Sequence, residues 1–166
     1  MGELRHMLRD DDVNHEEQKQ ILELGMKFRA DRFYHRPFEG PQGVAVIFDK
    51  PSTRTRSSFS IGVAELGGYP LVIDKSGEPV ADTAEVLTRM AYGIVWRTFE
   101  QSRVEQMARV ATVPVVNALT DEFHPCQVLA DFLTLAQFKG GVDNLENLKI
   151  AYVGDAANNM SNSYLL

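Results

Sequence analysis

A short run of hydroxyl and guanidinium side chains has the composition of a phosphate site: Ser52, Thr53, Arg54, Thr55 and Arg56. The run follows an apolar, β-branched stretch and opens a segment with helical periodicity, so its serine can cap a helix. The first N–H groups of a helix have no partner inside it, and the aligned peptide dipoles give this end a partial positive charge that attracts phosphate. The hydroxyls add donors, and the Arg54 guanidinium adds a planar fork for pairs of phosphate oxygens. The run therefore predicts an anion site, with a capped helix whose arginines face water as the alternative.

Polar side chains also follow two later apolar runs. Arg97 comes directly after Ile94-Val95-Trp96, and the run 113–117 leads through a short loop to His124-Pro125-Cys126-Gln127. In an open parallel sheet, ligands bind beyond the carboxyl ends of the strands, and these ends lie at one edge. We therefore expect four side chains to converge on one ligand: Arg54, Arg97, His124 and Gln127.

Each of these residues also has a purely structural interpretation. Arg97 would be a surface charge, His124 a side chain that caps a helix, and Gln127 a solvated residue of the first helical turn. Cys126 is interpreted as a small buried apolar group. The structural interpretation is weaker for these residues together than for each alone, because a polar donor follows each of three separate strands at the same edge of the sheet.

The elements that must position these residues alternate along the chain. Periodicity predicts helices over 14–30, 53–66, 82–92, 101–110 and 125–138, and strands over 44–48, 70–73, 94–96 and 113–117. Pro114 lacks an N–H and therefore favours the beginning of its strand or an edge of the sheet. Strands that alternate with helices predict an α/β fold, with a mostly parallel sheet and helices on both of its faces.

The glycines at 140 and 141 indicate a domain boundary. Residues 1–139 would then form one domain, and residues 140–166 would begin a second α/β domain, with a strand over 149–153 and a helix from Asn158 onward. The chain ends inside that helix on leucines and without a capping residue, so we expect it to be part of a longer protein.

Composition excludes several classes of function. A net charge of −6 argues against a general binder of nucleic acid or of anionic membranes, since both require a basic face. One cysteine excludes an intramolecular disulfide and a four-cysteine zinc site, and favours a reducing, cytoplasmic setting. No apolar run approaches the roughly 20 residues that span a bilayer.

Four motifs occur in the order found in ornithine carbamoyltransferases, and the resemblance covers essentially the whole chain. They are the run at 52–56, Trp96-Arg97-Thr98-Phe99, His124-Pro125-Cys126-Gln127, and the segment from Gly154 to Met160. The first and third motifs are similar in aspartate carbamoyltransferases. Cys126 and the paired asparagines at 158 and 159 resemble the ornithine branch.

The resemblance implies that the carbamoyl group of carbamoyl phosphate is transferred to the δ-amine of L-ornithine, giving L-citrulline and phosphate in arginine biosynthesis. It implies three catalytic residues, Arg54, Arg97 and His124, and a substrate-binding set of Ser52, Thr53, Arg54, Thr55, Arg97, His124, Gln127 and Asn159. Neither a metal nor an organic cofactor is implied. The resemblance also implies a homotrimer with active sites shared between subunits, and exposed apolar side chains at Phe33, Tyr34 and Phe38 would be compatible with such an assembly.

The resemblance is incomplete at two places. Asp74-Lys75-Ser76 runs straight into Gly77-Glu78-Pro79, where the family has a longer loop that reaches into the neighbouring active site. The loops that recognise the rest of ornithine would lie beyond residue 166. Two alternatives stay open: a carbamoyltransferase for another amine (aspartate, putrescine or an acylated ornithine), or a non-catalytic anion-binding domain of the same fold. The intact set of four donors disfavours the second.

Overall fold

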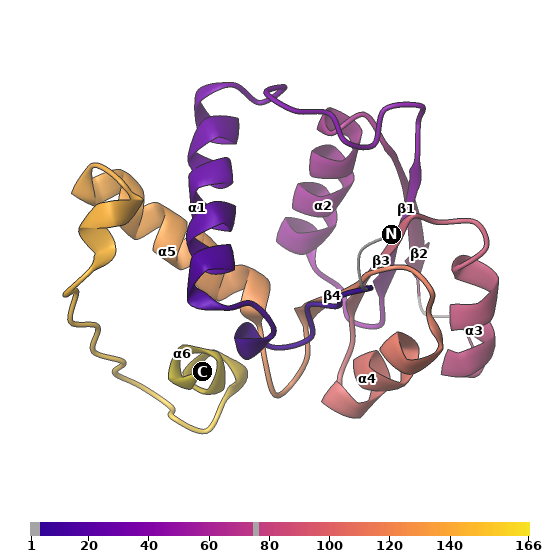
Figure 1. Ribbon diagram of the computed structural model, residues 1–166. Coiled ribbons are helices and arrows are strands. Elements are labelled where there is room, and N and C mark those ends of the chain that lie inside the picture. Colours follow the sequence, from indigo (N-terminus) through magenta and orange to yellow (C-terminus); the bar gives the residue numbers. More distant parts are fainter. Residues whose placement is uncertain (1–3, 75–76) are drawn as a thin grey trace.

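The computed structural model, which describes residues 4–74 and 77–166, is built on a parallel sheet of four strands (Figure 1). The strands are β1 (Gly43–Phe48), β2 (Tyr69–Asp74), β3 (Gly93–Arg97) and β4 (Val115–Leu119), and their order across the sheet is β2-β1-β3-β4. All three neighbouring pairs are parallel, which confirms the predicted α/β fold. The last strand begins after Pro114, whose carbonyl accepts a hydrogen bond from Ile94 but which has no N–H to donate.

The helices follow the predicted alternation. They are α1 (His15–Ala30), α2 (Thr53–Glu65), α3 (Val80–Leu87), α4 (Gln101–Val110), α5 (Pro125–Lys139) and α6 (Asn159–Leu165), with 3-10 turns η1 (Asp10–Asp12) and η2 (Val142–Leu145). The third helix is shorter than the predicted 82–92 at its C-terminal end. After Leu87 the backbone continues in turns, and the N–H of Tyr92 donates to the carbonyl of Gly43 at 2.8 Å, so this segment leads into β3 and does not extend the helix. Among the described residues, no helix is both long and apolar enough to cross a bilayer.

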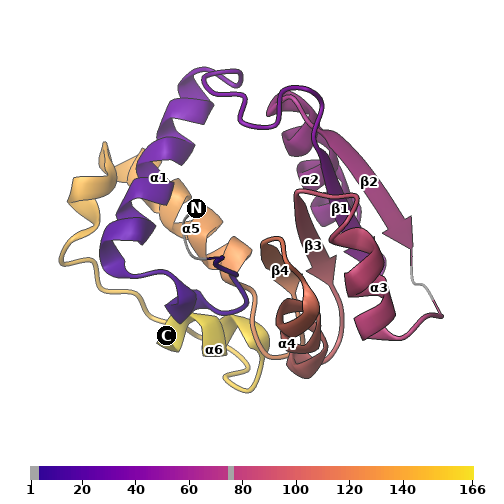
Figure 2. The same cartoon turned by 45° about the vertical axis from the view of Figure 1, so that its right-hand side comes forward.

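Apolar side chains of the central strands alternate between two cores, one on each face of the sheet. Ala45 and Ile47 point toward α3 and α4, where they join a cluster with Val104 and Met107. Val44 and Val46 point the other way and pack with Val63 of α2. Figure 2 shows α3 and α4 on one side of the sheet and α2 on the other, so the prediction of helices on both faces is confirmed.

The order of the strands reverses next to β1. The chain passes from β1 to β2 on one side, then crosses β1 to place β3 on its other side. The carboxyl ends of β1 and β3 therefore flank a topological switch point, which is where open α/β sheets bind ligands. Both of the arginines expected in the site, Arg54 and Arg97, follow or end these two strands.

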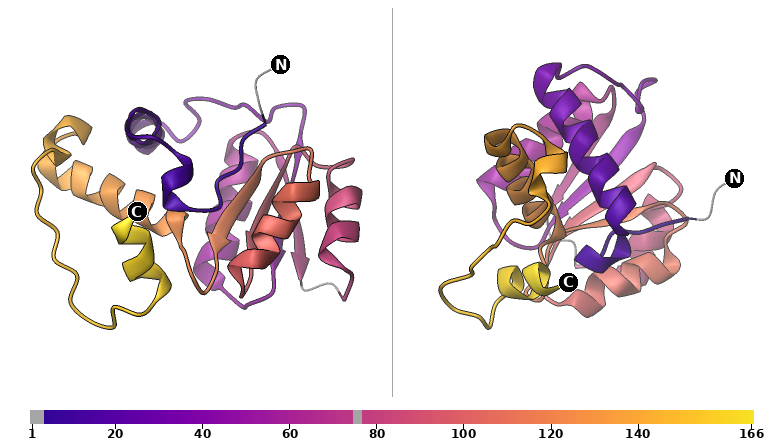
Figure 3. Two further views of the ribbon diagram at one scale, coloured as in Figure 1. Left: turned by 60° about the horizontal axis from the view of Figure 1, so that its bottom comes forward. Right: turned by 60° about the vertical axis from the view of Figure 1, so that its left-hand side comes forward.

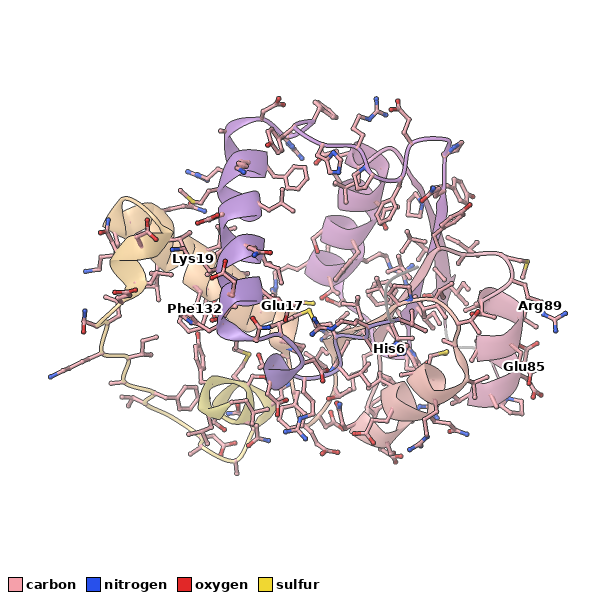
Figure 4. The ribbon with its side chains drawn as sticks, in the orientation of Figure 1. His6, Glu17, Lys19, Glu85, Arg89 and Phe132 are labelled. Atoms are coloured by element: carbon pink, nitrogen blue, oxygen red, sulfur yellow. The ribbon has the colours of Figure 1, made fainter. Side chains whose placement is uncertain are left out.

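The first helix begins with a reciprocal cap. The side chain of Asn14 accepts a hydrogen bond from the N–H of Glu17 at 2.9 Å, and the Glu17 carboxylate accepts one from the N–H of Asn14 at 2.9 Å. Glu17 and Lys19 are labelled in Figure 4, and Lys19 pairs with Asp143 beyond the end of α5. This pair joins α1 to η2, and α1 also lies beside α5 in Figures 1 and 3.

The segment before η1 lies along the edge of the sheet. Met7 forms a parallel bridge with Val116 of β4, and its N–H donates to the carbonyl of Val115 at 2.9 Å. The Nδ1 atom of His6 accepts the N–H of Val115 at 3.1 Å. These bonds occupy backbone groups that β4 would otherwise expose at an edge of the sheet.

The predicted strand over 149–153 is wrong. These residues are irregular and exposed, and within the described part of the chain they pair with no other strand. A strand is stable only when a neighbour satisfies its backbone groups, so an apolar run alone does not make one. Gly140 ends α5 in the left-handed conformation (φ 82°), as the predicted boundary requires, but the division into two domains stays a prediction.

The predicted helix from Asn158 is confirmed as α6, capped by the Asn158 side chain. This helix packs near the beginning of α5 (Figure 3), where the Ser163 hydroxyl accepts the N–H of His124 at 2.8 Å. The short connection predicted around residues 74–79 includes Lys75 and Ser76, which lie outside the described residues.

Candidate functional site

The N-terminus of α2 carries a network of hydroxyl groups. Ser52 is its N-cap: the side-chain oxygen accepts the N–H of Thr55 at 3.2 Å, and the hydroxyl donates to the Thr55 hydroxyl oxygen at 2.9 Å. That oxygen also accepts a hydrogen bond from Nη1 of Arg97 at 3.3 Å. The end of β3 is thereby joined to the first turn of α2, whose free N–H groups favour an anion.

The ends of β1, β3 and β4 meet α6 around one cavity of about 470 Å³. Its lining includes all but one of the residues predicted from the sequence: Ser52, Arg54, Thr55, Arg97, His124, Gln127 and Asn159. The exception is Thr53, which is exposed at the first position of α2 and does not line the cavity. The structure therefore brings together the three side chains expected to contact the reacting group, Arg54, Arg97 and His124.

The cavity is electropositive although the chain as a whole is acidic. Burial, and after it the positive charge of Arg54, lowers the pKa of the Arg97 guanidinium. The Nε atom of Arg97 is buried and makes no hydrogen bond within the described residues. Arg54 and Arg97 therefore repel each other, and Nε of Arg97 has a hydrogen bond still to donate. A bound anion would relieve the repulsion and accept this hydrogen bond.

His124 is held at the beginning of α5 with a neutral imidazole. Its backbone N–H is fixed by Ser163, and its side chain makes no capping hydrogen bond, so the helix-cap interpretation does not apply. Burial, and after it the charge of Arg97, lowers the pKa of the imidazole to about 4, against a smaller opposing effect of Asp131. The ring Nδ1 is buried and has no partner among the described residues. A neutral imidazole in this place can donate one hydrogen bond to a carbonyl oxygen.

Two of the remaining lining residues are tied to the backbone. The Cys126 thiol donates to the carbonyl of Asn117 at 3.4 Å, and burial raises its pKa to about 12, so it stays protonated. The thiol is buried, as the sequence suggested, although the residue as a whole keeps some exposed surface. The side-chain nitrogen of Asn159 donates to the carbonyl of Thr120 at 2.8 Å, whereas Asn158 serves as the cap of α6.

Gln127 is exposed at the rim of the cavity, and its amide nitrogen donates to Oδ1 of Asp131 at 2.9 Å. Arg56, by contrast, turns away from the cavity. Its guanidinium is paired with Asp74 at the end of β2 and lies 4.7 Å from the centre of the Phe48 ring. The arginine at this position therefore stabilises the edge of the site and leaves the cavity to Arg54.

A buried carboxylate between the ends of β1 and β3 was missed by the sequence analysis. The side chain of Asp49 is 4% exposed and accepts hydrogen bonds from the Thr98 hydroxyl at 2.6 Å and from Nη2 of Arg103 at 3.4 Å. Its backbone N–H donates to the carbonyl of Arg97 at 2.9 Å. Asp49 thus fixes the end of β1 against the end of β3. A carboxylate placed directly after an apolar strand was the available signal.

Comparison with known proteins gives one consistent result. The family model described as "Aspartate/ornithine carbamoyltransferase, carbamoyl-P binding domain" matches residues 5–137. The ornithine carbamoyltransferase of Bifidobacterium longum (strain NCC 2705) is 77% identical over 99% of this chain and 53% of its own length. That of Mycolicibacterium paratuberculosis (strain ATCC BAA-968 / K-10) is 54% identical over 98% of this chain and 53% of its own length. The chain spans about half the length of the curated relatives it matches.

Solved structures give the same result. The ornithine carbamoyltransferase from Pyrococcus furiosus superposes with a TM-score of 0.88 at 40% identity, covering 97% of this chain and 53% of that one. An N-acetyl-L-ornithine transcarbamylase variant superposes less well, with a TM-score of 0.77 at 28% identity, covering 84% of this chain and 50% of that one.

Proposed function

Because this chain belongs to the aspartate/ornithine carbamoyltransferase family, we propose that its cavity binds carbamoyl phosphate and that the whole protein transfers the carbamoyl group to L-ornithine. The products are L-citrulline and phosphate. The single observation that carries the proposal is the cavity itself, which Arg54, Arg97 and His124 line together with the first turn of α2.

The phosphate lies at the first turn of α2 in this proposal. The free N–H groups of the turn and the hydroxyls of Ser52 and Thr55 donate to its oxygens, and Arg54 and Arg97 balance its charge. Thr53 contributes its backbone N–H in place of its side chain, since the side chain lies outside the cavity lining. This assignment explains why an acidic chain concentrates in one cavity two guanidinium groups that form no ion pair with any described carboxylate.

The carbonyl group lies between Arg97 and His124. The lone pair of the neutral δ-amine forms a bond to the carbonyl carbon, and negative charge develops on the carbonyl oxygen. Arg97, His124 and Thr55 are placed to donate to that oxygen, and one strong donor of this kind contributes roughly 3–4 kcal/mol to the transition state. The carbonyl double bond then re-forms as the bond between carbon and the phosphate oxygen breaks. Phosphate leaves with the electron pair of that bond and takes up the proton that the amine nitrogen loses. The residues of this chain thus act by position and electrostatics.

The proposal extends to ornithine binding and to a homotrimeric assembly. Asn159 uses its amide nitrogen to hold Thr120, so its side-chain oxygen is the atom available to the amino-acid substrate. A homotrimer agrees with the exposure of Phe33 (61%) and Tyr34 (51%), which follow α1. Phe38 does not support it, because this ring is half-buried and packs against the apolar cluster beside α2. A cytoplasmic setting and a role in arginine biosynthesis are part of the same proposal.

The test separates ornithine from other amines. The full-length gene product is incubated with carbamoyl phosphate and one of four amines: ornithine, aspartate, putrescine or N-acetylornithine. We expect carbamoylated product from ornithine, as citrulline, and little from the others. Carbamoyl transfer to another amine in preference to ornithine would contradict the assignment of the acceptor.

A paired substitution separates an enzyme from a domain that only binds anions. Arg97→Met should lower kcat/KM by about 10²–10³-fold, because it removes a donor to the developing oxyanion. Arg109→Met, at the exposed end of α4, is the matched control and should leave the rate unchanged. Equal rates in the two variants would refute the catalytic role of the cavity.

A further inference from the structure

Asp131 connects the rim of the cavity to the last helix. It lies one helical turn after Gln127 on α5, and its Oδ1 atom accepts the amide nitrogen of Gln127 at 2.9 Å. Its other oxygen, Oδ2, accepts the hydroxyl of Tyr164 on α6 at 2.6 Å. One carboxylate therefore receives two donors, from the cavity rim and from a different element.

The chemistry of a carboxylate decides which way the Gln127 amide is turned. An ionised carboxylate only accepts hydrogen bonds, so the NH₂ end of the amide must face Asp131 and the carbonyl end must face away from it. Within the described residues, the Oε1 atom of Gln127 accepts no hydrogen bond, and the side chain lines the cavity. The Oε1 atom of Gln127 is therefore an acceptor available to a ligand in the cavity. If the amide were rotated by half a turn, its NH₂ group would stand there as a donor.

Tyr164 fixes Asp131 in turn. Its ring packs edge-on against Phe132, with centroids 6.4 Å apart, and lies 6.3 Å from the ring of Tyr152. Burial, and after it the bond to Asp131, raises the pKa of Tyr164 to about 12, so the hydroxyl remains a donor at neutral pH. The orientation of Gln127 is thus set by a chain of contacts that ends on α6.

We propose that Asp131 is a positioning residue that makes the cavity select a carbamoyl group over an acyl group. The two groups have nearly the same shape, but the carbamoyl NH₂ donates hydrogen bonds and the methyl of an acyl phosphate does not. An acceptor held at Gln127 Oε1 pairs with the NH₂, whereas a donor there would leave the two NH₂ groups facing each other. This inference rests on the proposed function, since it concerns the same cavity and the same substrate.

Asp131→Asn tests it, because an asparagine can donate as well as accept and no longer enforces one orientation of Gln127. The single tryptophan, Trp96, reports binding: it precedes Arg97 and its ring lies 5.1 Å from the Arg103 guanidinium. Its fluorescence is titrated with carbamoyl phosphate, acetyl phosphate and inorganic phosphate. We expect Asp131→Asn to weaken carbamoyl phosphate about fivefold and to change the other two less than twofold.

Two further variants make the result specific. Tyr164→Phe leaves Asp131 with one donor fewer and should give a smaller loss in the same direction. Asp143→Asn is the matched control, since Asp143 pairs with Lys19 away from the cavity, and it should leave all three affinities unchanged. Asp131 also raises the pKa of His124, but burial and Arg97 outweigh it, so the imidazole stays neutral at pH 7 without Asp131.

The outcomes distinguish this inference from the proposed function. A carbamoyl preference that survives in Asp131→Asn, or an equal loss for all three ligands, would overturn the role of Asp131 alone. Equal affinity of the unmodified chain for carbamoyl and acetyl phosphate would overturn both. A second measurement needs no ligand: the side-chain NH₂ signals of Gln127 in ¹⁵N-labelled protein should shift in Asp131→Asn and not in Asp143→Asn. Unshifted signals would overturn the contact on which the inference depends.

Discussion

Lowering the pH tests whether the pKa of His124 is depressed as strongly as the burial of its ring and the charge of Arg97 require. Its pKa falls from an ordinary 6.5 to about 4, with burial as the main cause and Arg97 as the second. Because the folded-state pKa is depressed, the unfolded chain takes up the proton first as the pH falls. The stability that the neutral ring contributes is therefore complete above pH 6.5 and is lost progressively as the pH falls toward 4.

The magnitude follows from the size of the shift. A change of one in pKa corresponds to about 1.4 kcal/mol, so the full shift corresponds to roughly 3 kcal/mol. Solvent reaches part of the ring and screens its charge, which reduces our expectation to about 2 kcal/mol. His6 also has a pKa lowered by burial, against the opposing charge of Asp12, so the pH dependence of the whole chain does not isolate His124.

The assay combines a titration with a variant. Proton NMR of the four histidines, with His124→Asn used for assignment, gives each midpoint directly. Urea unfolding at pH 7 and pH 4 should show that the unmodified chain loses about 2 kcal/mol more than His124→Asn over this interval. A midpoint near 6.5 for His124, with equal losses in the two proteins, would refute the claim that the imidazole is buried beside Arg97.

Three further perturbations address the remaining parts of the account. Asp49→Ala leaves the fully buried hydroxyl of Thr98 without its acceptor and should lower the free energy of unfolding by about 2–4 kcal/mol in urea titrations; a loss below about 1 kcal/mol would contradict its role in joining the ends of β1 and β3. Thr55→Val removes the oxygen that accepts from Arg97, so carbamoyl phosphate should bind about tenfold more weakly, whereas Thr134→Val on the exposed side of α5 should not change binding. Gly67 has φ 89° and a Cβ there would lie 3.0 Å from neighbouring backbone, so Gly67→Ala should cost about 1–2 kcal/mol of stability by thermal or urea unfolding; an unchanged stability would mean that the turn relaxes.

Most of the fold was predictable because the apolar runs are buried on both faces and the helices carry local signals. The cap at Asn14 and Glu17, the cap at Ser52 and the left-handed Gly140 are set by neighbours within a few residues. The strand over 149–153 failed because its existence depends on a neighbouring strand, which local sequence does not reveal. Likewise, the segment after α3 has a distant partner that local sequence does not reveal, since the N–H of Tyr92 donates to the carbonyl of Gly43.

The site was predictable to the level of which residues meet, because parallel strands bring their carboxyl ends to one edge. Thr53 is the exception, because it lies on a different side of α2 from Thr55. The two residues are two positions apart in the helix, so only Thr55 lines the cavity. Asp49 was missed because its partners, Thr98 and Arg103, are distant in the sequence. Asp131, by contrast, lies four residues after Gln127 and was accessible to a helical spacing argument.

A crystal structure with a phosphonate analogue of carbamoyl phosphate, such as phosphonoacetamide, is the most direct test of the central claim. We predict that the phosphonate lies at the first turn of α2 within about 2.7–3.2 Å of donors from Arg54 and Arg97, and that His124 donates to the carbonyl oxygen. An analogue bound in another part of the molecule, or one in this cavity with its carbonyl out of reach of both Arg97 and His124, would contradict it.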